Sequence, residues 1–490
     1  MNIRHLNIGI LHSLIGKNDG VSIVIDQTVN AMVQNMGIRL GNIYFLAAHT
    51  SPRFNAQTNE IFWHKNNVHK TILKHYNDDP PPTLDNMIQE NAEYAKKIIQ
   101  DFISRHDIDL LIAHNTAHPY NFITAVALGL YLQEQRQKGI IWPKVLVWWH
   151  DSHYERERFK NPNSVITKYL KYLPGTWISG IIFINSLQEK IAKSYFREYL
   201  EGDGEYLDDF FKYRTEIIPN TSDIFWDWRS RDWNDNRIVK PPQDKYNDTF
   251  LRDVGLLKKV QKKGFELNDT VILLQHTRVV PRKRIERAID LAFLLDRKFK
   301  KEKKKKCVAL LISGYSGDEQ TPYKQFLTDH FNQRDKKYEA NNVVMVFGEN
   351  IILSHRDIIV DRKYYKFEEI PAIIAGHGGI GTYFSEIEGY GNNLLEMISY
   401  GLPVLINKYN TYKTEIENLG FDLPATESCE ITDDLVDRAY QLYYDIRYRN
   451  RIVKHNLEVL DRNLSHKIIA DKLSPFIREI FTRELGLLKD

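Results

Sequence analysis

The chain has 490 residues, of which 42% are hydrophobic and 27% are charged, and its formal net charge is +3. Because this length exceeds the size at which a single hydrophobic core stops growing, we expect two domains, and the composition excludes disorder as the main state. A net charge this small on so long a chain argues against nucleic acid as the main partner.

The cysteine content and the N-terminal stretch both indicate a reducing compartment. The chain has two cysteines, Cys307 and Cys429, which excludes a disulfide framework and a cysteine-rich zinc site. The first residues, MNIRHLNIGILHSLIGKNDG, enter a strand-like run without the long apolar segment of a secretory signal. No apolar run approaches the ~20 residues of a membrane-spanning helix. We therefore expect a cytoplasmic protein.

Short β-rich runs alternate with helical stretches in the first half of the chain, which predicts parallel strands joined by crossover helices. The stretch VSIVIDQTVNAMVQNMG has the apolar stripe of a helix and ends at Gly37, a favourable C-cap. The expected strands are Ile3–Leu11, Ile43–Ala48, Leu110–His114, Val145–His150, Ile181–Ile184 and Glu216–Ile218.

The alternation fails between Asp223 and Asp253, a polar, tryptophan-rich stretch that we interpret as a linker or insertion. It restarts in TVILLQHT, VALLISGY, VVMVFGEN, a short apolar run within IPAIIAGHGGIGTYF, and PVLINKY. The expected fold class is therefore α/β, with one Rossmann-like domain in residues 1–235, a second in residues 236–462, and a cleft between them. The tail, residues 463–490, is expected to be a helix that returns to the first domain.

A lysine-rich run, FKKEKKKKC, spans Phe299–Cys307. It is typical of a solvated helix end and loop before the next strand. The alternative is peripheral contact with an acidic acceptor or with the inner membrane surface, because clustered lysines attract anionic headgroups. The lysines concerned are Lys300, Lys301, Lys303, Lys304, Lys305 and Lys306.

Polar side chains follow many of the expected strands. In open parallel sheets, ligands bind beyond the carboxyl ends of the strands, so the residues just after each strand are candidates for ligand contact. The residues that this rule selects are His114, Asn115, His150, Asp151, Asn220, His276, Arg278, Gly314, Gly348 and Glu349.

The stretch HTRVVPRKRIERAIDLA supplies cations after one of these strands. Pro281 marks a turn, and a helix is expected to begin near Arg284, which places Arg278 and Lys283 in the strand-to-helix loop. An arginine fork and a lysine point charge together suit a diphosphate. Basic surface residues in a loop would give the same pattern.

The stretch SEIEGYGNNLLEMISYGLPVL combines two glutamates with a glycine turn. After Gly391, the run NNLLEMISYG should form a helix that ends at Gly401, and the N-terminus of that helix attracts anions. Gly389 and Gly391 let the backbone approach a ligand closely. Glu396, within the helix, could accept hydrogen bonds from a diol such as ribose, and Glu388 lies in the loop. Taken alone, the stretch is equally compatible with two surface glutamates around a turn.

With these residues in hand, the sequence resembles the GT-B fold glycosyltransferases, and most closely the retaining enzymes of glycosyltransferase family 4. The stretch Glu388–Val404 matches the family pattern of Glu, glycine-aromatic-glycine, a second Glu within a helix, and Gly-x-Pro-Val. RVVPRK (Arg278–Lys283) matches the basic loop, and IIPNTSD (Ile217–Asp223) matches the segment that closes the first domain. In LVWWHDSH, His150 occupies the position of a histidine that contacts the donor sugar.

Some stretches depart from the family pattern. The loop NDGVS has Asp19 before Gly20 where the family often has Gly-Gly, and Arg284 stands where the family usually has Gly. The run GHGGIG is unusually rich in glycine, and residues 51–85 and 223–253 have no counterpart in the family.

The resemblance implies a hexosyltransferase that moves a sugar from a nucleoside diphosphate sugar to a hydroxyl acceptor with retention of anomeric configuration. The expected donor is UDP-glucose, and the acceptor is a sugar, a glycan or a lipid-linked compound. The first domain would bind the acceptor and the second the donor. No cofactor would be required. The leaving phosphate itself could take the acceptor proton, which explains why no dedicated base is obvious in the sequence.

The resemblance also implies roles for individual residues. Arg278 and Lys283 would neutralise the departing diphosphate, while Glu388 and His150 would contact the donor sugar, and these four form the expected catalytic set. The expected donor-binding residues are Glu396, which would contact the ribose, and Gly389, Tyr390, Gly391, Asn392, Asn393 and Gly20.

No metal is required in this scheme. The one literal Asp-x-Asp, Asp107–Asp109, lies before its strand, at the wrong end of the sheet for a ligand, and we interpret it as a structural turn. His64, His69 and His75 show no ligand spacing with cysteines or carboxylates, and we expect them at the surface.

Two alternatives of other classes remain. One is a phosphorolytic enzyme of the same fold, which Glu396 argues against because phosphorolysis needs no ribose contact. The other is a non-catalytic nucleotide-sugar or glycan-binding protein, which the intact cationic loop and glutamates argue against. A nicotinamide enzyme is disfavoured, because no strand is followed by Gly-x-Gly-x-x-Gly and a helix.

Overall fold

The computed structural model describes residues 2–17, 19–175, 177–199, 204–314 and 321–487. The chain forms two compact units. Unit 1 comprises Met1–Thr221 together with His466–Asp490, and unit 2 comprises Ser222–Ser465. The chain therefore begins and ends in the same unit.

Unit 1 is built on a parallel sheet with the strand order β5-β3-β1-β6-β7-β8-β9. The central strands β6 and β7 are buried along their whole length, as expected for parallel strands that are covered on both faces. The strands are β1 (Ile8–Leu11), β3 (Ile43–Ala47), β5 (Ala56–Thr58), β6 (Leu110–His114), β7 (Lys144–Trp149), β8 (Gly180–Phe183) and β9 (Thr215–Ile217), and a separate pair is formed by β2 (Leu14–Ile15) and β4 (His49–Thr50).

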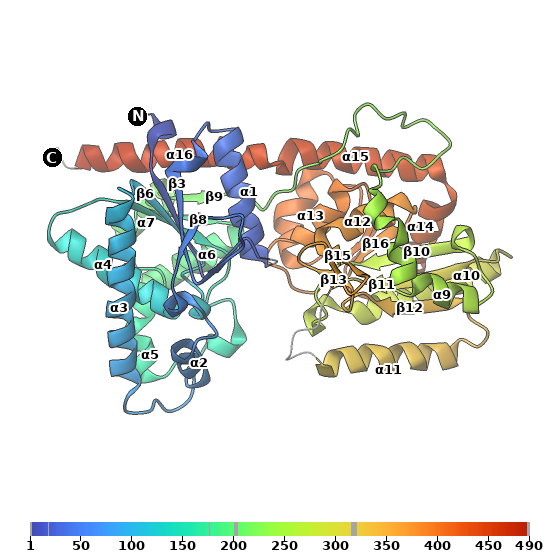
Figure 1. The fold of residues 1–490 in the computed structure, drawn as a ribbon, viewed down its shortest axis with the longest axis horizontal. Helices are drawn as coiled ribbons and strands as arrows, with labels where there is room; N and C mark the ends of the chain where they lie inside the picture. The colour runs from blue at the N-terminus through green and yellow to red at the C-terminus, as the bar shows by residue number, and fades with distance from the viewer. Residues whose placement is uncertain (1, 18, 176, 200–203, 315–320, 488–490) are drawn as a thin grey trace. The chain divides into compact units, whose positions relative to one another are not determined.

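The helices of unit 1 cover this sheet, and the last helix of the chain is one of them. Figure 1 shows α16 crossing one end of α1, and the two helices are in contact. A side chain at Gly180 would lie 3.0 Å from Phe476 and Ile480, so α16 packs closely over β8. The helices are α1 (Gly20–Gln34), α2 (Asn67–Lys74), α3 (Leu84–Arg105), α4 (Phe122–Gln137), α5 (Ser164–Tyr169), α6 (Ser186–Tyr199), α7 (Gly204–Tyr213) and α16 (His466–Leu487).

Unit 2 repeats the plan with the strand order β12-β11-β10-β16-β17-β18. Its strands are β10 (Thr270–Gln275), β11 (Cys307–Ile312), β12 (Val343–Phe347), β16 (Ile380–Tyr383), β17 (Val404–Asn407) and β18 (Ala425–Thr426), and a small additional sheet contains β13 (Ile352–Leu353), β14 (Asp357–Ile359) and β15 (Arg362–Lys366). Its helices are α8 (Phe250–Asp253), α9 (Leu256–Lys262), α10 (Ile285–Lys301), α11 (Thr321–Lys337), α12 (Ile370–Gly376), α13 (Asn392–Ser399), α14 (Asp433–Tyr444) and α15 (Ile446–Leu464).

The boundary between the units differs from the expected position at residue 235. Trp226, Trp228 and Trp233 pack with Val453 and Leu457 of α15 in one buried cluster. The indole N–H of Trp226 also donates to the carbonyl of Ser399 at 2.9 Å. Because these tryptophans bury their apolar surface in unit 2, the chain changes unit at Ser222 and not at residue 235.

Two local predictions were wrong. The apolar run IPAIIAG forms the helix α12 and the strand begins only at Ile380, because Pro371 in the first turn favours a helix start. The first expected strand begins at Ile8 and not at Ile3, since Ile3–His5 form a 3-10 turn in which the side chain of Asn2 accepts from the Arg4 N–H.

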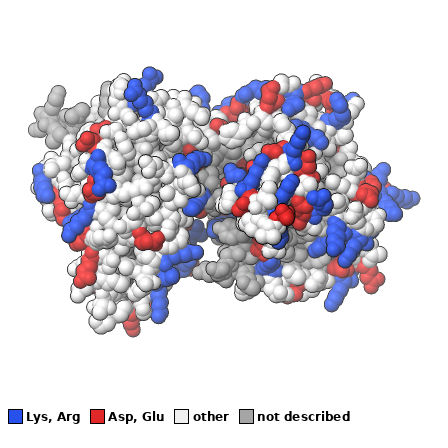
Figure 2. All heavy atoms as spheres, in the orientation of Figure 1, with Lys and Arg blue, Asp and Glu red and all other residues white. Residues whose placement is uncertain are grey.

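The lysine-rich run lies at the end of α10 and in the loop before β11. Lys300 pairs with Asp296 at 2.7 Å, and Lys306 pairs with Asp269 at 2.8 Å, so part of its charge is neutralised within unit 2. On the face drawn in Figure 2, Lys and Arg alternate with Asp and Glu over both units. Within the part of the chain that the structure describes, no helix is both long and apolar enough to cross a membrane.

Candidate functional site

The glycine turn before α13 is shaped by close backbone packing. Gly391 has φ +124°, and a Cβ atom there would lie 2.3 Å from the hydroxyl oxygen of Tyr409. That hydroxyl donates to the carbonyl of Tyr390 at 2.6 Å. Asn392 and Asn393 begin α13, so their backbone N–H groups lie at the positive end of the helix. The turn therefore requires glycine, and it ends in a helix N-terminus suited to anions.

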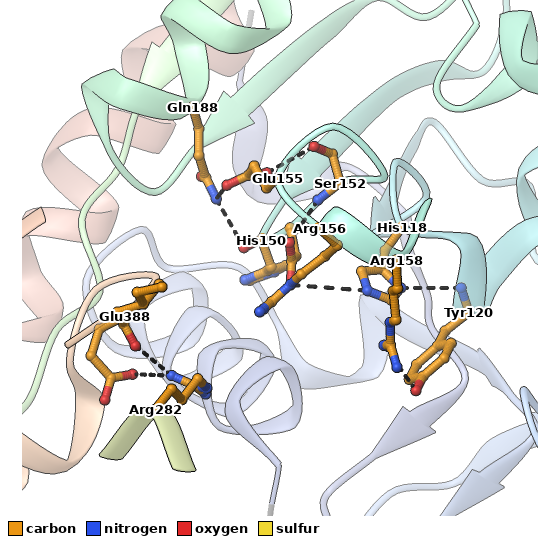
Figure 3. Close-up of polar contacts among 12 residues, drawn as sticks. His118, Tyr120, His150, Ser152, Glu155, Arg156, Arg158, Gln188, Arg282 and Glu388 are labelled. Atoms are coloured by element: carbon orange, nitrogen blue, oxygen red, sulfur yellow. Dashed lines mark hydrogen bonds and ion pairs between the residues drawn. The ribbon is translucent and has the colours of Figure 1, made fainter. Parts of the chain in front are cut away.

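Glu388, just before this turn, is paired with two cations. Its Oε2 accepts from Arg282 Nη1 at 3.0 Å, as Figure 3 shows, and its Oε1 accepts from Lys283 Nζ. Arg282 Nη1 also donates to the carbonyl of Ile387 at 2.6 Å. The Lys283 and Glu388 side chains are only 5% and 7% exposed. A buried ion pair thus joins the loop after β10 to the loop after β16.

The protonation of this pair follows from burial and charge. Burial alone would raise the pKa of Glu388, but Lys283 and Arg282 outweigh it and bring that pKa to about 2. Burial lowers the pKa of Lys283 to about 8, against the opposing effect of Glu388. At neutral pH both groups are charged. Lys283 carries three N–H donors, so it can serve Glu388 and a second anion together.

Arg278 lies in the same loop as Lys283 but does not share its ion pair. Its side chain is exposed, and no described residue forms a salt bridge with its guanidinium. The neighbouring strand end comes very close, because a Cβ at Gly314 would lie 1.8 Å from the carbonyl oxygen of Thr277. The structure therefore brings Lys283 and Glu388 together and leaves Arg278 facing solvent.

Glu396 is oriented by a buried histidine. Its Oε2 lies 3.1 Å from His276 Nε2, and His276 Nδ1 lies 2.8 Å from the hydroxyl of Ser313. A carboxylate only accepts, so Nε2 carries a proton and donates to Glu396. The imidazole also stacks on Phe367 at 4.0 Å between ring centres. Glu396, 19% exposed, keeps acceptor capacity for a further donor.

More polar groups surround Glu396 in unit 2. Burial and the neighbouring Glu396 raise the pKa of Glu368, against the effect of Lys366. Burial, together with Glu396 and two other glutamates, raises the pKa of Tyr400 to about 12. The end of α13 is thus rich in acceptors and suited to hydroxyl groups rather than to anions.

In unit 1, three histidines follow three adjacent strands. His12 follows β1, His114 ends β6, and His150 follows β7. His114 Nδ1 lies 3.0 Å from His150 Nε2, and His12 Nδ1 lies 3.2 Å from the His114 carbonyl oxygen. The side chain of Gln188 donates to the His150 carbonyl at 2.9 Å. Because strands β1, β6 and β7 are neighbours, residues distant in sequence form one cluster.

These histidines are neutral at physiological pH. Burial, followed by the effect of His12, lowers the pKa of His150 to about 3. Burial likewise lowers the pKa of His114 well below its usual value, and it lowers the pKa of His12 against the opposing effect of Asp19. The cluster can therefore give and accept hydrogen bonds, but it brings no positive charge to a ligand.

Gly20 is the first residue of α1, and Asp19 is its N-cap. Asp19 Oδ1 accepts from the backbone N–H groups of Val21 and Ser22, each at 3.1 Å. Gly20 is not among the described glycines with positive φ. Asp19 is therefore the N-cap of α1 and satisfies two of its first backbone N–H groups.

Several histidines differ from the expectation that they lie on the surface. His69 is fully buried, and its Nε2 accepts from the backbone N–H of Ile123 at 3.4 Å. His64 is half-buried and stacks on Tyr120 at 4.8 Å between ring centres. Both lie in the segment of residues 51–85, which packs against the first turns of α4 and its neighbours. In the described ranges, no set of three or more His, Cys, Asp or Glu side chains is arranged to hold a metal ion.

Three features of the site were not predicted from the sequence. They are Arg282, the hydrogen bond between His276 and Glu396, and His12. Arg282 stands beside Lys283 in RVVPRK, and His12 directly follows an expected strand, so both carried a usable signal. The partner of Lys283 carried none, because Glu388 is 105 residues away. The adjacency of β10 and β16 brings them together.

No family model matches the chain. The curated mannosylglucosylglycerate synthase of Petrotoga mobilis is 26% identical over 434 residues, which cover 85% of this chain and 86% of that protein. Among solved structures, HepE of Anabaena in complex with UDP and glucose has a TM-score of 0.55 at 13% identity, covering 97% of this chain and 100% of that one. The UDP-forming α,α-trehalose-phosphate synthase of Burkholderia xenovorans has a TM-score of 0.60 at 8% identity, with 97% and 99% coverage.

The chain has the GT-B fold. The two Rossmann-like units and these structural likenesses confirm the fold class expected from the sequence. At 8% to 13% identity, the likenesses show the fold and nothing finer. What the site does must be argued from its own residues.

Proposed function

We propose that the chain is a glycosyltransferase that transfers a hexose from a nucleoside diphosphate sugar to a hydroxyl acceptor with retention of anomeric configuration. The observation that carries the proposal is the Lys283–Glu388–Arg282 group beside the glycine turn and the N-terminus of α13. Cations, a fixed carboxylate and the N-terminus of a helix meet there, which suits a diphosphate bound to a sugar.

In the proposed complex, the diphosphate takes hydrogen bonds from Lys283 and from the N-terminus of α13 at Asn392 and Asn393. Arg278, exposed in the loop after β10, adds a planar fork for the same phosphates. Gly389 and Gly391 keep side chains away from the phosphates, and Tyr390 anchors the turn from its buried side. The negative charge that develops on the leaving group is thus met by groups already in place.

The sugar and the ribose take separate carboxylates. Glu388, held by two cations, accepts from hydroxyl groups of the transferred sugar. Glu396, held by His276, accepts from the ribose hydroxyls. In the transfer step, the bond between the anomeric carbon and the phosphate oxygen breaks, and the acceptor oxygen bonds to the same face of that carbon. The acceptor proton moves to the departing phosphate oxygen, which requires no separate protein base.

The relatives narrow the choice of donor. The Petrotoga relative is named for a mannosyl product, and the Anabaena neighbour was solved with UDP and glucose. UDP-glucose is the donor implied by the family resemblance, and a nucleotide sugar that carries mannose is the second candidate because of that relative's name. Gly20 and His150 enter the proposal as donor contacts from unit 1. A cytoplasmic location and membrane contact through Lys300, Lys301 and Lys303 to Lys306 stay predictions.

The test is a panel of UDP-, GDP- and ADP-sugars, with hydrolysis and transfer products followed by mass spectrometry and the anomeric configuration by NMR. We expect turnover of one donor class and a product with the donor's configuration. Failure to bind or turn over any nucleotide sugar would sink the proposal. Tight binding without turnover would favour a non-catalytic protein, and sugar release that depends on added inorganic phosphate would favour a phosphorylase.

A further inference from the structure

The loop after β7 in unit 1 presents an arginine that the mechanism above does not use. Arg158 is exposed, and its Nη2 donates to the hydroxyl of Tyr120 at 3.0 Å. Its guanidinium carbon lies 5.0 Å from the centre of the Tyr120 ring and 4.6 Å from the centre of the Phe159 ring. His64 stacks on Tyr120 at 4.8 Å with an interplanar angle of 7°. Stacked aromatic rings therefore fix the direction of a charged, solvent-facing guanidinium.

This guanidinium has no counter-ion in the described parts of unit 1. The neighbouring Arg156 is neutralised, since its Nε donates to Asp151 Oδ2 at 2.7 Å. No described carboxylate forms a salt bridge with Arg158, and Tyr120 is the one acceptor that its side chain reaches among described residues. Nη2 carries two N–H groups, so its second N–H, together with those of Nε and Nη1, stays available to a ligand. An arginine without a carboxylate partner keeps donors for a bidentate bond to a carboxylate or phosphate of a ligand.

The backbone that carries Arg158 is held in place. Asn77 donates to the Arg158 carbonyl at 2.7 Å. Earlier in the loop, the half-buried Glu155 accepts from the indole N–H of Trp149 at 3.0 Å and from the hydroxyl of Ser152 at 2.9 Å. These bonds tie the loop to the end of β7. A ligand would thus meet a positioned arginine without first ordering the loop.

The same loop connects this arginine to His150. Asp151 directly follows His150 and accepts from Arg156, and its Oδ2 lies 4.0 Å from His118 Nε2. The His118 ring in turn contacts Tyr120 edge-on at 4.7 Å between ring centres. Figure 3 shows this succession from His150 through Arg156 and His118 to Arg158 and Tyr120. A molecule that contacts His150 can therefore extend toward Arg158 within unit 1.

We propose that Arg158 recognises an oxyanion, a carboxylate or a phosphate, on the acceptor molecule. The inference rests on the proposed function, because it assigns the substrate class of the acceptor in that reaction. The acceptor is then a hydroxyl compound that carries an acidic group. Arg158 binds that group through two parallel N–H donors. A neutral sugar of the same size leaves this fork without a partner.

The test compares acceptors that differ only in the acidic group. With the active donor of the panel, transfer to glucosylglycerate is measured against glucosylglycerol, and transfer to glucose 6-phosphate against glucose. We expect kcat/KM for one acidic acceptor to exceed that of its neutral match at least tenfold. Preference within the first pair assigns a carboxylate, and preference within the second assigns a phosphate. Equal use of acidic and neutral acceptors in both pairs would overturn the inference.

Variants of Arg158 separate recognition from structure. In Arg158→Gln, the ratio of acidic to neutral kcat/KM should fall tenfold to a hundredfold toward one, and Arg158→Lys should restore part of it because the charge returns without the fork. Arg105→Gln, a change at an exposed arginine paired with Asp101 on α3, should keep the wild-type ratio. An Arg158→Gln enzyme that loses activity equally with acidic and neutral acceptors would contradict the assignment.

Failure of this inference is distinguishable from failure of the proposed function. Donor hydrolysis without acceptor reports on the proposed function alone. If no donor is turned over, calorimetric titration of the full chain with D-glycerate and with inorganic phosphate still tests the site. Wild-type protein should then bind one anion at least tenfold more tightly than Arg158→Gln does, and equal binding would refute the role of Arg158.

Discussion

The two units place polar groups at the same end of similar sheets, but they use opposite electrostatics. In unit 2 the buried groups stay charged, because Glu388 and Lys283 compensate one another and Arg282 adds to the pair. In unit 1 the imidazoles of His114 and His150 contact one another, and burial keeps both neutral. This difference suits the Lys283–Glu388 pair of unit 2 to a ligand that carries charge. It suits His114 and His150 of unit 1 to hydrogen bonds with neutral hydroxyl groups.

Removing the buried cation of unit 2 should have the largest effect. Lys283→Ala is expected to lower kcat/KM by about a thousandfold, equivalent to about 4 kcal/mol, because charge on the leaving diphosphate loses its partner. Steady-state transfer assays with the active donor measure this. Lys454→Ala, at an exposed pair with Glu458 in the same unit, is the matched control and should be nearly silent. Transfer at the full rate in Lys283→Ala would show that the assigned diphosphate role is wrong.

Acid should destabilise unit 1 at a higher pH than unit 2. The pKa of His150 lies at about 3 in the folded state against about 6.5 in the unfolded chain, so unfolded chains bind more protons, and stability is lost as pH falls below about 6.5. The pKa of Glu388, about 2, lies below its unfolded value, so its contribution of about 3 kcal/mol is lost only as pH falls from about 4.5 toward 2.

Hydrogen exchange followed by mass spectrometry between pH 7 and 3 checks this order. Peptides of β6 and β7 should lose protection at higher pH than peptides of β10 and β16. His355→Gln, a change at an exposed histidine of unit 2, should leave both profiles in place. Simultaneous loss of protection in both units above pH 5 would contradict the expectation that unit 1 loses stability at a higher pH than unit 2.

A smaller effect is expected at Glu396. Glu396→Gln should raise KM for the donor tenfold to a hundredfold, because a hydrogen bond to a charged acceptor is worth about 1.5–3 kcal/mol. The discriminating measurement uses a donor that lacks the ribose hydroxyls, for which wild type and variant should differ less than threefold. A penalty that is equal for both donors would mean that Glu396 acts through His276 and not on the ribose.

The smallest effect concerns the histidine pair of unit 1. His114→Phe keeps a ring of similar size and removes the bond to His150, so kcat/KM should fall about tenfold, and His114→Gln should recover part of the loss. In His150→Ala, kcat/KM should fall further. Adding His114→Phe to that variant should lower kcat/KM little more, since His114 acts through His150. Additive losses would show that His114 contacts a ligand itself.

The fold was predictable because buried parallel strands carry continuous apolar runs, which are readable in β6, β7 and β10. The helix α12 was not predictable in the same way, because a short apolar run is compatible with both a helix and a strand. In the structure Pro371 lies in the first turn of that helix. Within the site, residue types were readable but partners were not. Lys283 was expected to face a diphosphate with Arg278, and its bond to Glu388 depends on strand order, which no local pattern encodes.

The return of α16 to unit 1 has a consequence for synthesis on the ribosome. Residues 222–465 of unit 2 are contiguous and emerge completely before α16 does. Strand β8 meanwhile lacks Phe476 and Ile480, the side chains that close over Gly180. The sheet of the N-terminal unit can therefore be covered at β8 only after residues 222–465 have been translated, because Phe476 and Ile480 lie beyond them in the chain.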